Sequence, residues 1–386
     1  MQWKRSNINP WSVSPGSATS TTQETPKTPV HGGDLVWAAA LAGCSAEELL
    51  DFSANINPLG PPETARAAIT AHLDSLKAYP DPDYQQLRQA LAQMHQLPPE
   101  WIIPGNGAAE LLTWVAWSLS RLEATYLVTP AFGDYWRALR AFNVKVLECP
   151  LSAVSGRWSL AWNYGYATLR DRSQTLQKGL LLNNPHNPTG RLWIREEICS
   201  ILDRFALVVV DEAFMDFLPP DQEQSLIPVV RDYPHLVIVR SLTKFYSLPG
   251  LRLGYAIAHP DRLQQWRSWR DPWPVNTLAA AAGVACVGDT QFQQQTWSWL
   301  PPTRYDLLRG LGSLPGLQPF PSAANFLLVE SDYPSSQLQS ALLLHYQLLI
   351  RDCLSFSELG DRYFRVAVRS AADNQRLLSS LADLLS

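Results

Sequence analysis

Residues 241–254 read S-L-T-K-F-Y-S-L-P-G-L-R-L-G. This stretch follows an apolar run typical of a buried strand. Lys244 is one of only six lysines in the 386-residue chain, and an amine placed after a strand can condense with an aldehyde. The hydroxyls of Ser241 and Thr243 can hydrogen-bond a phosphate, and Arg252 can supply a fixed, forked counter-charge. The pattern therefore predicts a Schiff-base lysine beside an anion site.

The composition argues against several classes of protein. A net charge of −4 and a pI near 6.0 give no sign of a nucleic-acid-binding face. Five scattered cysteines show no metal-ligand spacing, which predicts reduced thiols in the cytoplasm and no metal site. Residues 1–30 are rich in Ser, Thr and Pro and hold no apolar segment of signal-peptide or membrane length. We expect a disordered extension there, with an organelle transit peptide as the alternative.

From about residue 100 the chain alternates short apolar runs with helix-like segments. The runs are residues 124–128, 144–147, 179–182, 207–210, 236–239 and 253–258. This alternation predicts an α/β fold with a mostly parallel sheet that has helices on both faces and binds ligands at the carboxyl ends of its strands.

We predict four parts of the chain. They are an extension over 1–30, an N-terminal segment over 31–76 that packs on the small domain, a large α/β domain over 77–275, and a linking helix with a small α+β domain over 276–386.

Polar motifs follow the predicted strands. Residues 211–214 read D-E-A-F and place Asp211 at a strand end, where its carboxylate can pair with a protonated pyridine nitrogen, although a helix cap is the alternative. Residues 183–190 read N-N-P-H-N-P-T-G. Asn187 would lie at the edge of the sheet, where it can donate a hydrogen bond to a ring oxygen. A turn this rich in Asn, Pro and Gly could also serve only to connect two elements.

Two further features precede these motifs. Residues 105–110 read G-N-G-A-A-E and come before a predicted helix, so Gly107 and Ala108 can bring the backbone close to a phosphate at the helix N-terminus. Phe132, in P-A-F after the run 124–128, could stack on an aromatic ring. A lone phenylalanine is more often part of the core.

The glycine turn, stacking aromatic, N-P-x-G, D-x-A, S-x-x-K and downstream arginine occur here in the order found in one family. The chain resembles the fold-type-I pyridoxal-phosphate enzymes of the class I and II aminotransferase group. The resemblance implies pyridoxal 5'-phosphate as the cofactor and a large domain with a mostly parallel, seven-stranded-type sheet. It also implies a homodimer in which Tyr79 reaches the neighbouring subunit's cofactor phosphate.

Within that family the chain resembles the L-threonine-O-3-phosphate decarboxylases of cobalamin biosynthesis. The resemblance rests on H-G-G-D at 31–34, D-F-S-A-N-I-N-P-L-G at 51–60, Phe214 in place of a tyrosine, and two C-terminal arginines. It implies decarboxylation of L-threonine O-3-phosphate to (R)-1-aminopropan-2-yl phosphate and CO2. The substrate-binding residues that it implies are His31, Gly32, Asn187, Arg351 and Arg365.

Alternatives and departures remain. The first alternative is an aminotransferase acting on histidinol phosphate with 2-oxoglutarate, and the second is a non-catalytic protein on the same fold. Intact Lys244 and Asp211 argue against the second. Asp34 replaces an asparagine of the pattern, and two alanines follow Gly107 where a polar pair is more usual. Neither departure changes the family, and the sequence does not identify the group that reprotonates Cα.

Overall fold

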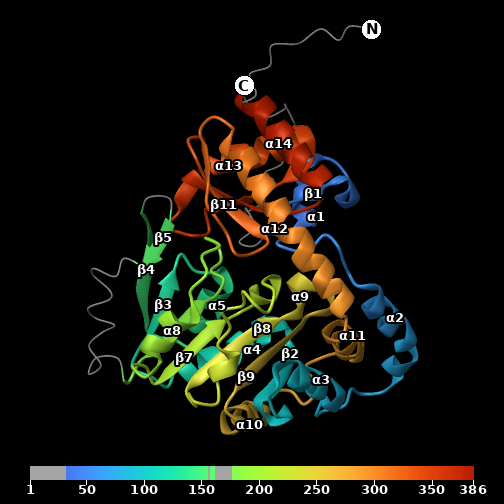
Figure 1. Ribbon diagram of the computed structural model, residues 1–386, viewed down its shortest axis with the longest axis vertical. Helices are drawn as coiled ribbons and strands as arrows, with labels where there is room; N and C mark the ends of the chain where they lie inside the picture. The colour runs from blue at the N-terminus through green and yellow to red at the C-terminus, as the bar shows by residue number, and fades with distance from the viewer. Residues whose placement is uncertain (1–31, 155–156, 161–175) are drawn as a thin grey trace, which may run out of the picture.

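The computed structural model describes residues 32–154, 157–160 and 176–386. His31, the predicted phosphate ligand, lies just outside the described residues. Two groups of elements form the molecule, one around a large sheet and one around a small sheet (Figure 1).

The large sheet has eight strands in the order β2-β9-β8-β7-β6-β3-β4-β5. Its strands are β2 (Ile102–Asn106), β3 (Thr125–Thr129), β4 (Val146–Val154), β5 (Arg157–Leu160), β6 (Gly179–Asn183), β7 (Leu207–Asp211), β8 (Leu236–Ser241) and β9 (Leu253–Ala258). Strands β4, β3, β6, β7 and β8 pair in parallel, whereas β9 is antiparallel to both of its neighbours. The predicted mostly parallel α/β sheet is confirmed.

The sheet differs from the expectation in two places. The eighth strand, β5, pairs antiparallel with residues 151–154 of β4, beyond the stretch of β4 that pairs with β3. The apolar runs also do not reveal β2, because Pro104 and Gly105 interrupt its pattern. A proline is tolerated there because β2 is the first strand in the sheet order and one of its edges has no strand beside it.

Helices cover both faces of this sheet. Successive residues of β7 point to opposite sides, so Val208 and Val210 belong to one apolar cluster and Leu207 and Val209 to the other. The helices of this part are α3 (Gln85–His95), α4 (Gly107–Leu119), α5 (Gly133–Ala141), α8 (Arg195–Leu202), α9 (Leu242–Phe245), α10 (Pro260–Trp269) and α11 (Thr277–Val287).

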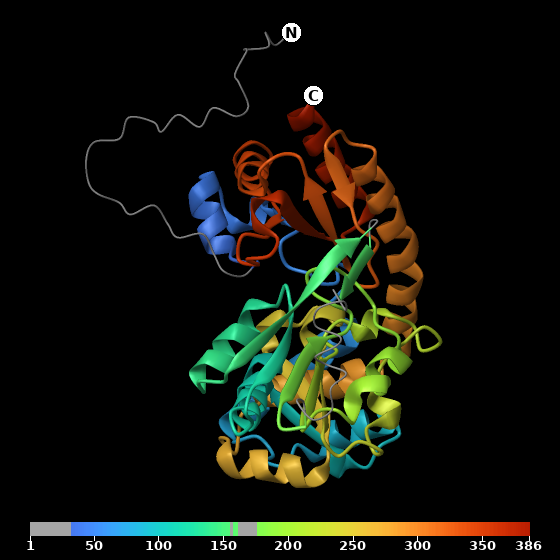
Figure 2. The same ribbon diagram turned by 90° about the vertical axis from the view of Figure 1, so that its left-hand side faces the viewer.

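The second part is built on an antiparallel sheet in the order β10-β11-β14-β13. Its elements are α12 (Thr290–Gly312), β10 (Leu317–Pro319), β11 (Phe326–Ser331), α13 (Ser335–Tyr346), β12 (Leu348–Leu349), β13 (Arg351–Asp352), β14 (Tyr363–Ala367) and α14 (Ala371–Leu385). Helix α12 runs along one side of the molecule and joins the two parts (Figures 1 and 2).

The helical region predicted after residue 275 is two helices, because the chain turns at Gly288. The side chain of Asn276 accepts a hydrogen bond from the backbone N–H of Ala279 and starts α11, and Asp289 caps α12 in the same way through Phe292. None of the helices over the described ranges is long and apolar enough to cross a bilayer.

The N-terminal segment contacts both parts. Strand β1 (Leu50–Asp51) pairs in parallel with β12, and α1 (Leu35–Ala42) packs against α13 of the small part. Helix α2 (Glu63–Ala71) lies instead against α11 (Figure 1). Residues 31–76 are predicted to pack on the small domain. Helix α1 and strand β1 contact that part, whereas α2, with its buried Ala65, contacts α11 of the large part.

Two histidines lie beside neutral partners, His186 fully buried and His95 half-buried. His95 Nε2 lies 2.8 Å from the Tyr255 hydroxyl, and His186 Nδ1 lies 2.8 Å from the Thr189 hydroxyl. Burial lowers the pKa of each imidazole from 6.5 to about 3. Both side chains are therefore neutral in the folded protein at pH 6, where the unfolded chain would protonate them.

We expect His95 and His186 to lower the free energy of unfolding as the pH falls from 6.5 to 5, against an opposite contribution from Asp216, whose pKa burial raises to about 6. The unfolded state binds protons there that the folded state does not, which costs up to about 1.4 kcal/mol per pH unit for each histidine. Urea unfolding at pH 7, 6 and 5 measures this slope. His95→Gln should lose less stability between pH 7 and pH 5 than the wild type loses, and equal changes would contradict a His95 that stays neutral in the folded protein.

Candidate active site

A cavity of about 580 Å³ lies at the carboxyl ends of the central strands, between the large sheet and the small part. The sequence-predicted site residues that line it are Gly32, Ala108, Phe132, Asn187, Asp211, Ser241, Thr243, Lys244, Arg252, Arg351 and Arg365. The cavity forms here because β6, β7 and β8 are parallel neighbours, so the motifs that follow them meet at one edge.

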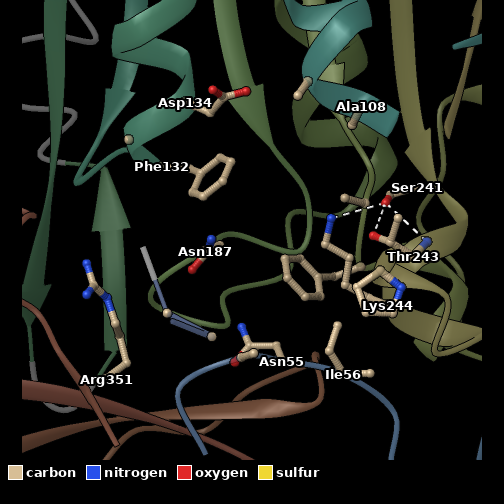
Figure 3. Close-up of a pocket in the computed structure, with 18 of the residues that line it drawn as sticks. Asn55, Ile56, Ala108, Phe132, Asp134, Asn187, Ser241, Thr243, Lys244 and Arg351 are labelled. Atoms are coloured by element: carbon tan, nitrogen blue, oxygen red, sulfur yellow. Dashed lines mark hydrogen bonds between the residues drawn. The ribbon is translucent and has the colours of Figure 1, made fainter. Parts of the chain in front are cut away.

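Lys244 lies in the short helix α9, directly after β8. Its Nζ donates a hydrogen bond to the Ser241 hydroxyl at 3.1 Å, and that hydroxyl is 2.8 Å from the hydroxyl of Thr243 (Figure 3). Burial lowers the pKa of Lys244, although the carboxylate of Asp211 opposes the shift. A larger share of the amine is therefore uncharged near neutral pH, as a nucleophile requires.

Asp211 ends β7 beside this lysine. Its Oδ2 accepts a hydrogen bond from the Tyr135 hydroxyl at 2.7 Å, and its Oδ1 accepts one from the backbone N–H of Ala213 at 2.9 Å. Burial raises the pKa of Asp211, while the Tyr135 hydrogen bond and Lys244 oppose the rise. A cationic ring nitrogen bound against this carboxyl would stabilise its ionised form.

Small residues form the end of the cavity near α4. Gly107 has φ +71°, and a Cβ added there would lie 2.8 Å from Arg252 Nη2. A Cβ on Gly254 would lie 2.7 Å from the backbone nitrogen of Ala108. The glycines thus let the first turn of α4 approach Arg252 and β9. With the hydroxyls after β8, this end can hold a phosphate dianion.

The opposite wall carries two arginines from the small part. Arg365, on β14, donates to Oδ1 of Asn187 and, at 3.1 Å, to the backbone oxygen of Ser53. The first contact uses the amide oxygen of Asn187 and leaves its Nδ2 group as the donor for a ligand. Arg351 lies across the cavity from Lys244 (Figure 3) and donates to the Ser355 hydroxyl at 2.5 Å.

The N-terminal segment closes a third side. A Cβ on Gly32 would lie 2.3 Å from the backbone oxygen of Ser53, and the N–H of Gly33 donates to the Ser53 hydroxyl at 2.8 Å. The unusual Asp34 does not line the cavity: its Oδ1 accepts a hydrogen bond from the backbone N–H of Trp37 at 2.9 Å and caps α1. The Asp34 carboxylate therefore caps a helix and does not line the cavity.

Sequence reasoning missed several residues of the cavity. Asn55 points into it (Figure 3), and its buried Oδ1 has no hydrogen-bond partner among the described residues. The position of Asn55 within the motif at 51–60 is the feature of the sequence that could have identified it as a cavity residue. Ser53 lies in the same motif and shares that feature. Nothing in the sequence singled out Tyr135 or Asp134, because only the folded chain brings α5 beside the strand ends.

Tyr79 lies outside the cavity of this chain. It is 79% exposed and its ring stacks on that of Trp273 at 4.4 Å. The role predicted for it requires a second subunit and stays a prediction. The described residues contain no group of three or more potential metal ligands from His, Cys, Asp and Glu side chains.

Comparisons with known proteins identify the family of the chain. Residues 47–381 match the family described as aminotransferase class I and II. The chain belongs to this family. It is 42% identical over 361 residues to a threonine-phosphate decarboxylase from Salmonella typhimurium, covering 92% of this chain and 96% of that protein. It is 33% identical to a histidinol-phosphate aminotransferase from Symbiobacterium thermophilum, covering 86% and 90%.

Solved structures give the same fold. A histidinol-phosphate aminotransferase from Clostridium acetobutylicum is similar with a TM-score of 0.79 and 27% identity, covering 87% of this chain and 98% of that one. An L-threonine-O-3-phosphate decarboxylase from Porphyromonas gingivalis has a TM-score of 0.76 and 26% identity, covering 86% and 98%.

Family membership implies pyridoxal 5'-phosphate as the cofactor, and the residues of the cavity fit it. Lys244 offers a half-buried amine with a lowered pKa, and Asp211 offers a buried carboxyl whose ionised form a cationic partner would stabilise. Gly107 and Gly254 leave room for the turn that would receive the phosphate. When bound, the cofactor supplies an electron sink for the pair of electrons left at the substrate Cα.

We expect Lys244→Ala to abolish turnover while the protein still binds the cofactor non-covalently through its phosphate. Borohydride reduction followed by mass spectrometry should show covalent cofactor on the wild type and none on the variant. Lys145→Ala, which removes an exposed lysine before β4, is the control and should behave as the wild type. Turnover by Lys244→Ala, or its covalent labelling, would contradict the assignment.

Proposed function

We propose that the protein is a pyridoxal-phosphate-dependent decarboxylase that converts L-threonine O-3-phosphate to (R)-1-aminopropan-2-yl phosphate and CO2 in cobalamin biosynthesis. The observation that carries this proposal is the 42% identity to a threonine-phosphate decarboxylase over 92% of the chain, against 33% to a histidinol-phosphate aminotransferase. The charges of the cavity support it, because a substrate with a carboxylate and a phosphate needs cationic groups at two places.

Arg351 and Arg365 are the residues that we assign to the substrate carboxylate. Arg365 is held from two sides, by Asn187 and by the backbone of Ser53, so its guanidinium lies in a fixed plane. A planar, forked cation suits a bidentate contact with a carboxylate. The protein would choose the bond that breaks by fixing how this carboxylate stands relative to the cofactor ring.

Apolar side chains limit the water around the reacting atoms. Phe132, Phe214 and Phe356 line the cavity, and Phe214 packs edge-to-face on Phe326 at 5.1 Å. The lowered pKa of Lys244 keeps its Nζ available to take up or return a proton once the substrate amine has replaced it. Low water access also strengthens the contacts between the arginines and the substrate.

The phosphate of the substrate would lie near the N-terminal segment. Gly32 lines the cavity, and His31 precedes it in the chain. A protonated imidazole beside a backbone N–H is a suitable site for a dianion.

The second candidate is an aminotransferase acting on histidinol phosphate, favoured by the 0.79 TM-score to an enzyme of that name. In that case the Cα hydrogen, and not the carboxylate, would be released, with Lys244 as the base.

We also propose a cytoplasmic homodimer whose Tyr79 reaches the neighbouring cavity. The exposure of Tyr79 and its stacking on Trp273 support this, since both rings are available to a partner.

The test of the proposed function is release of 14CO2 from carboxyl-labelled L-threonine O-3-phosphate by the cofactor-loaded protein, with no 2-oxo acid present. We expect release that depends on the phosphate of the substrate. No release from a protein that shows the visible absorbance of bound cofactor would contradict the proposal. Formation of glutamate from histidinol phosphate and 2-oxoglutarate would then support the aminotransferase.

We expect His31→Ala to raise KM for L-threonine O-3-phosphate much more than for unphosphorylated L-threonine, because it removes a charge that contacts only the phosphate. His72→Ala, which removes an exposed histidine of the N-terminal segment, is the control. Steady-state kinetics with both substrates measures the difference. Equal increases in KM would show that His31 is not a phosphate ligand.

A further inference from the structure

The turn at the start of α4 has to hold the cofactor phosphate without help from its own side chains. Ala108 and Ala109 follow Gly107, and Ala108 lines the cavity near Ser241 (Figure 3). Methyl groups cannot donate hydrogen bonds, so Ala108 and Ala109 offer a phosphate only their backbone N–H groups. Their directions depend on the conformation of residues 104–108, and something outside the turn must fix it.

Glu110 supplies one part of that support. Its Oε2 accepts a hydrogen bond from the backbone N–H of Asn106 at 2.6 Å, and its Oε1 accepts one from Trp114 Nε1 at 2.9 Å. The carboxylate therefore reaches back from the first turn of α4 to the residue before the helix, as in a capping box. It also brings a negative charge to the helix end that would receive a phosphate dianion.

Arg270 supplies the other part from the end of α10. Its Nε lies 3.3 Å from Glu110 Oε1, and its Nη1 donates to the backbone oxygen of Pro104 at 2.7 Å. Only 5% of its side chain is exposed. One buried guanidinium thus neutralises the Glu110 carboxylate and holds the residue at which the turn begins.

We propose that Glu110 and Arg270 are positioning residues that fix residues 104–107 so that the turn binds the cofactor phosphate. Glu110 holds the N–H of Asn106, and Arg270 holds the oxygen of Pro104 while cancelling a charge that would otherwise repel the phosphate. The proposal rests on the cofactor site and not on the identity of the amino-acid substrate. The simpler alternative is that Glu110 only caps α4 and stabilises the fold.

Measuring cofactor binding by the apo-protein distinguishes the positioning role from a purely structural helix cap. We expect Arg270→Gln to raise the Kd for pyridoxal 5'-phosphate about tenfold, because it leaves an unneutralised carboxylate in the first turns of the helix whose N-terminus receives the phosphate. The Kd for pyridoxal, which lacks the phosphate, should change by less than about twofold. Both are measured by equilibrium dialysis. Arg267→Gln is the matched control, since Arg267 is also on α10 but is 37% exposed and pairs with Asp83 at 3.8 Å.

The double variant Glu110→Gln with Arg270→Gln tests the charge directly. The amide oxygen that Glu110→Gln introduces can still accept from the Asn106 N–H but carries no charge, so most of the affinity for pyridoxal 5'-phosphate should return. Arg270→Lys keeps the charge with a single donor group, and should weaken binding of pyridoxal 5'-phosphate less than Arg270→Gln if the latter folds poorly.

Three results would overturn the proposal. They are an unchanged Kd for pyridoxal 5'-phosphate in both Arg270 variants, an equal loss of affinity for pyridoxal, and a double variant that binds no better than Arg270→Gln. An equal loss for both ligands would mark Arg270 as a purely structural residue. These outcomes are independent of the decarboxylation test, because no substrate is present.

Discussion

A buried ion pair ties together the two strands that carry the reactive groups. Arg240, the residue before Ser241, donates from Nε to Glu212 Oε2 at 2.9 Å, and Glu212 is the residue after Asp211. Both side chains are almost fully buried. Although burial alone would lower it, the carboxylates of Glu212, Asp216 and Glu223 keep the pKa of Arg240 well above its usual range. Breaking such a pair costs about 3–5 kcal/mol, so the ends of β7 and β8 are held in register.

The register between β7 and β8 determines which side chains face the cavity. Side chains alternate along a strand, so the ion pair of Arg240 with Glu212 lies on the other side of the backbone from Asp211 and Ser241, which face the cavity. The large sheet thereby supplies the amine, the acid and the phosphate end of the site. The small part, joined through α12, contributes Arg351 and Arg365 to the cavity, and we propose that they bind the substrate carboxylate. In this proposal the large sheet binds the cofactor and the small part selects the substrate.

Much of the sheet and part of the cavity lining could be predicted from the sequence, because the motifs that contain Asn187, Asp211 and Lys244 each begin at or just after the end of an apolar run. The strand-end rule turns such adjacency along the chain into proximity in space. Tyr135, Asn55 and the support that α10 gives to the glycine turn could not be predicted in this way. Their contacts join segments far apart in the chain, such as Asp211 with a residue 76 positions earlier. Strand β2 was missed because its proline and glycine hide its apolar pattern.

A decarboxylase breaks the bond from Cα to the carboxylate and spares the Cα hydrogen. The most direct measurement uses L-threonine O-3-phosphate with deuterium at Cα, in ordinary water, with mass spectrometry of the amine product. Decarboxylation predicts that the product retains the deuterium and gains one hydrogen from solvent. Complete loss of the label, with an oxo product, would contradict the account and indicate transamination.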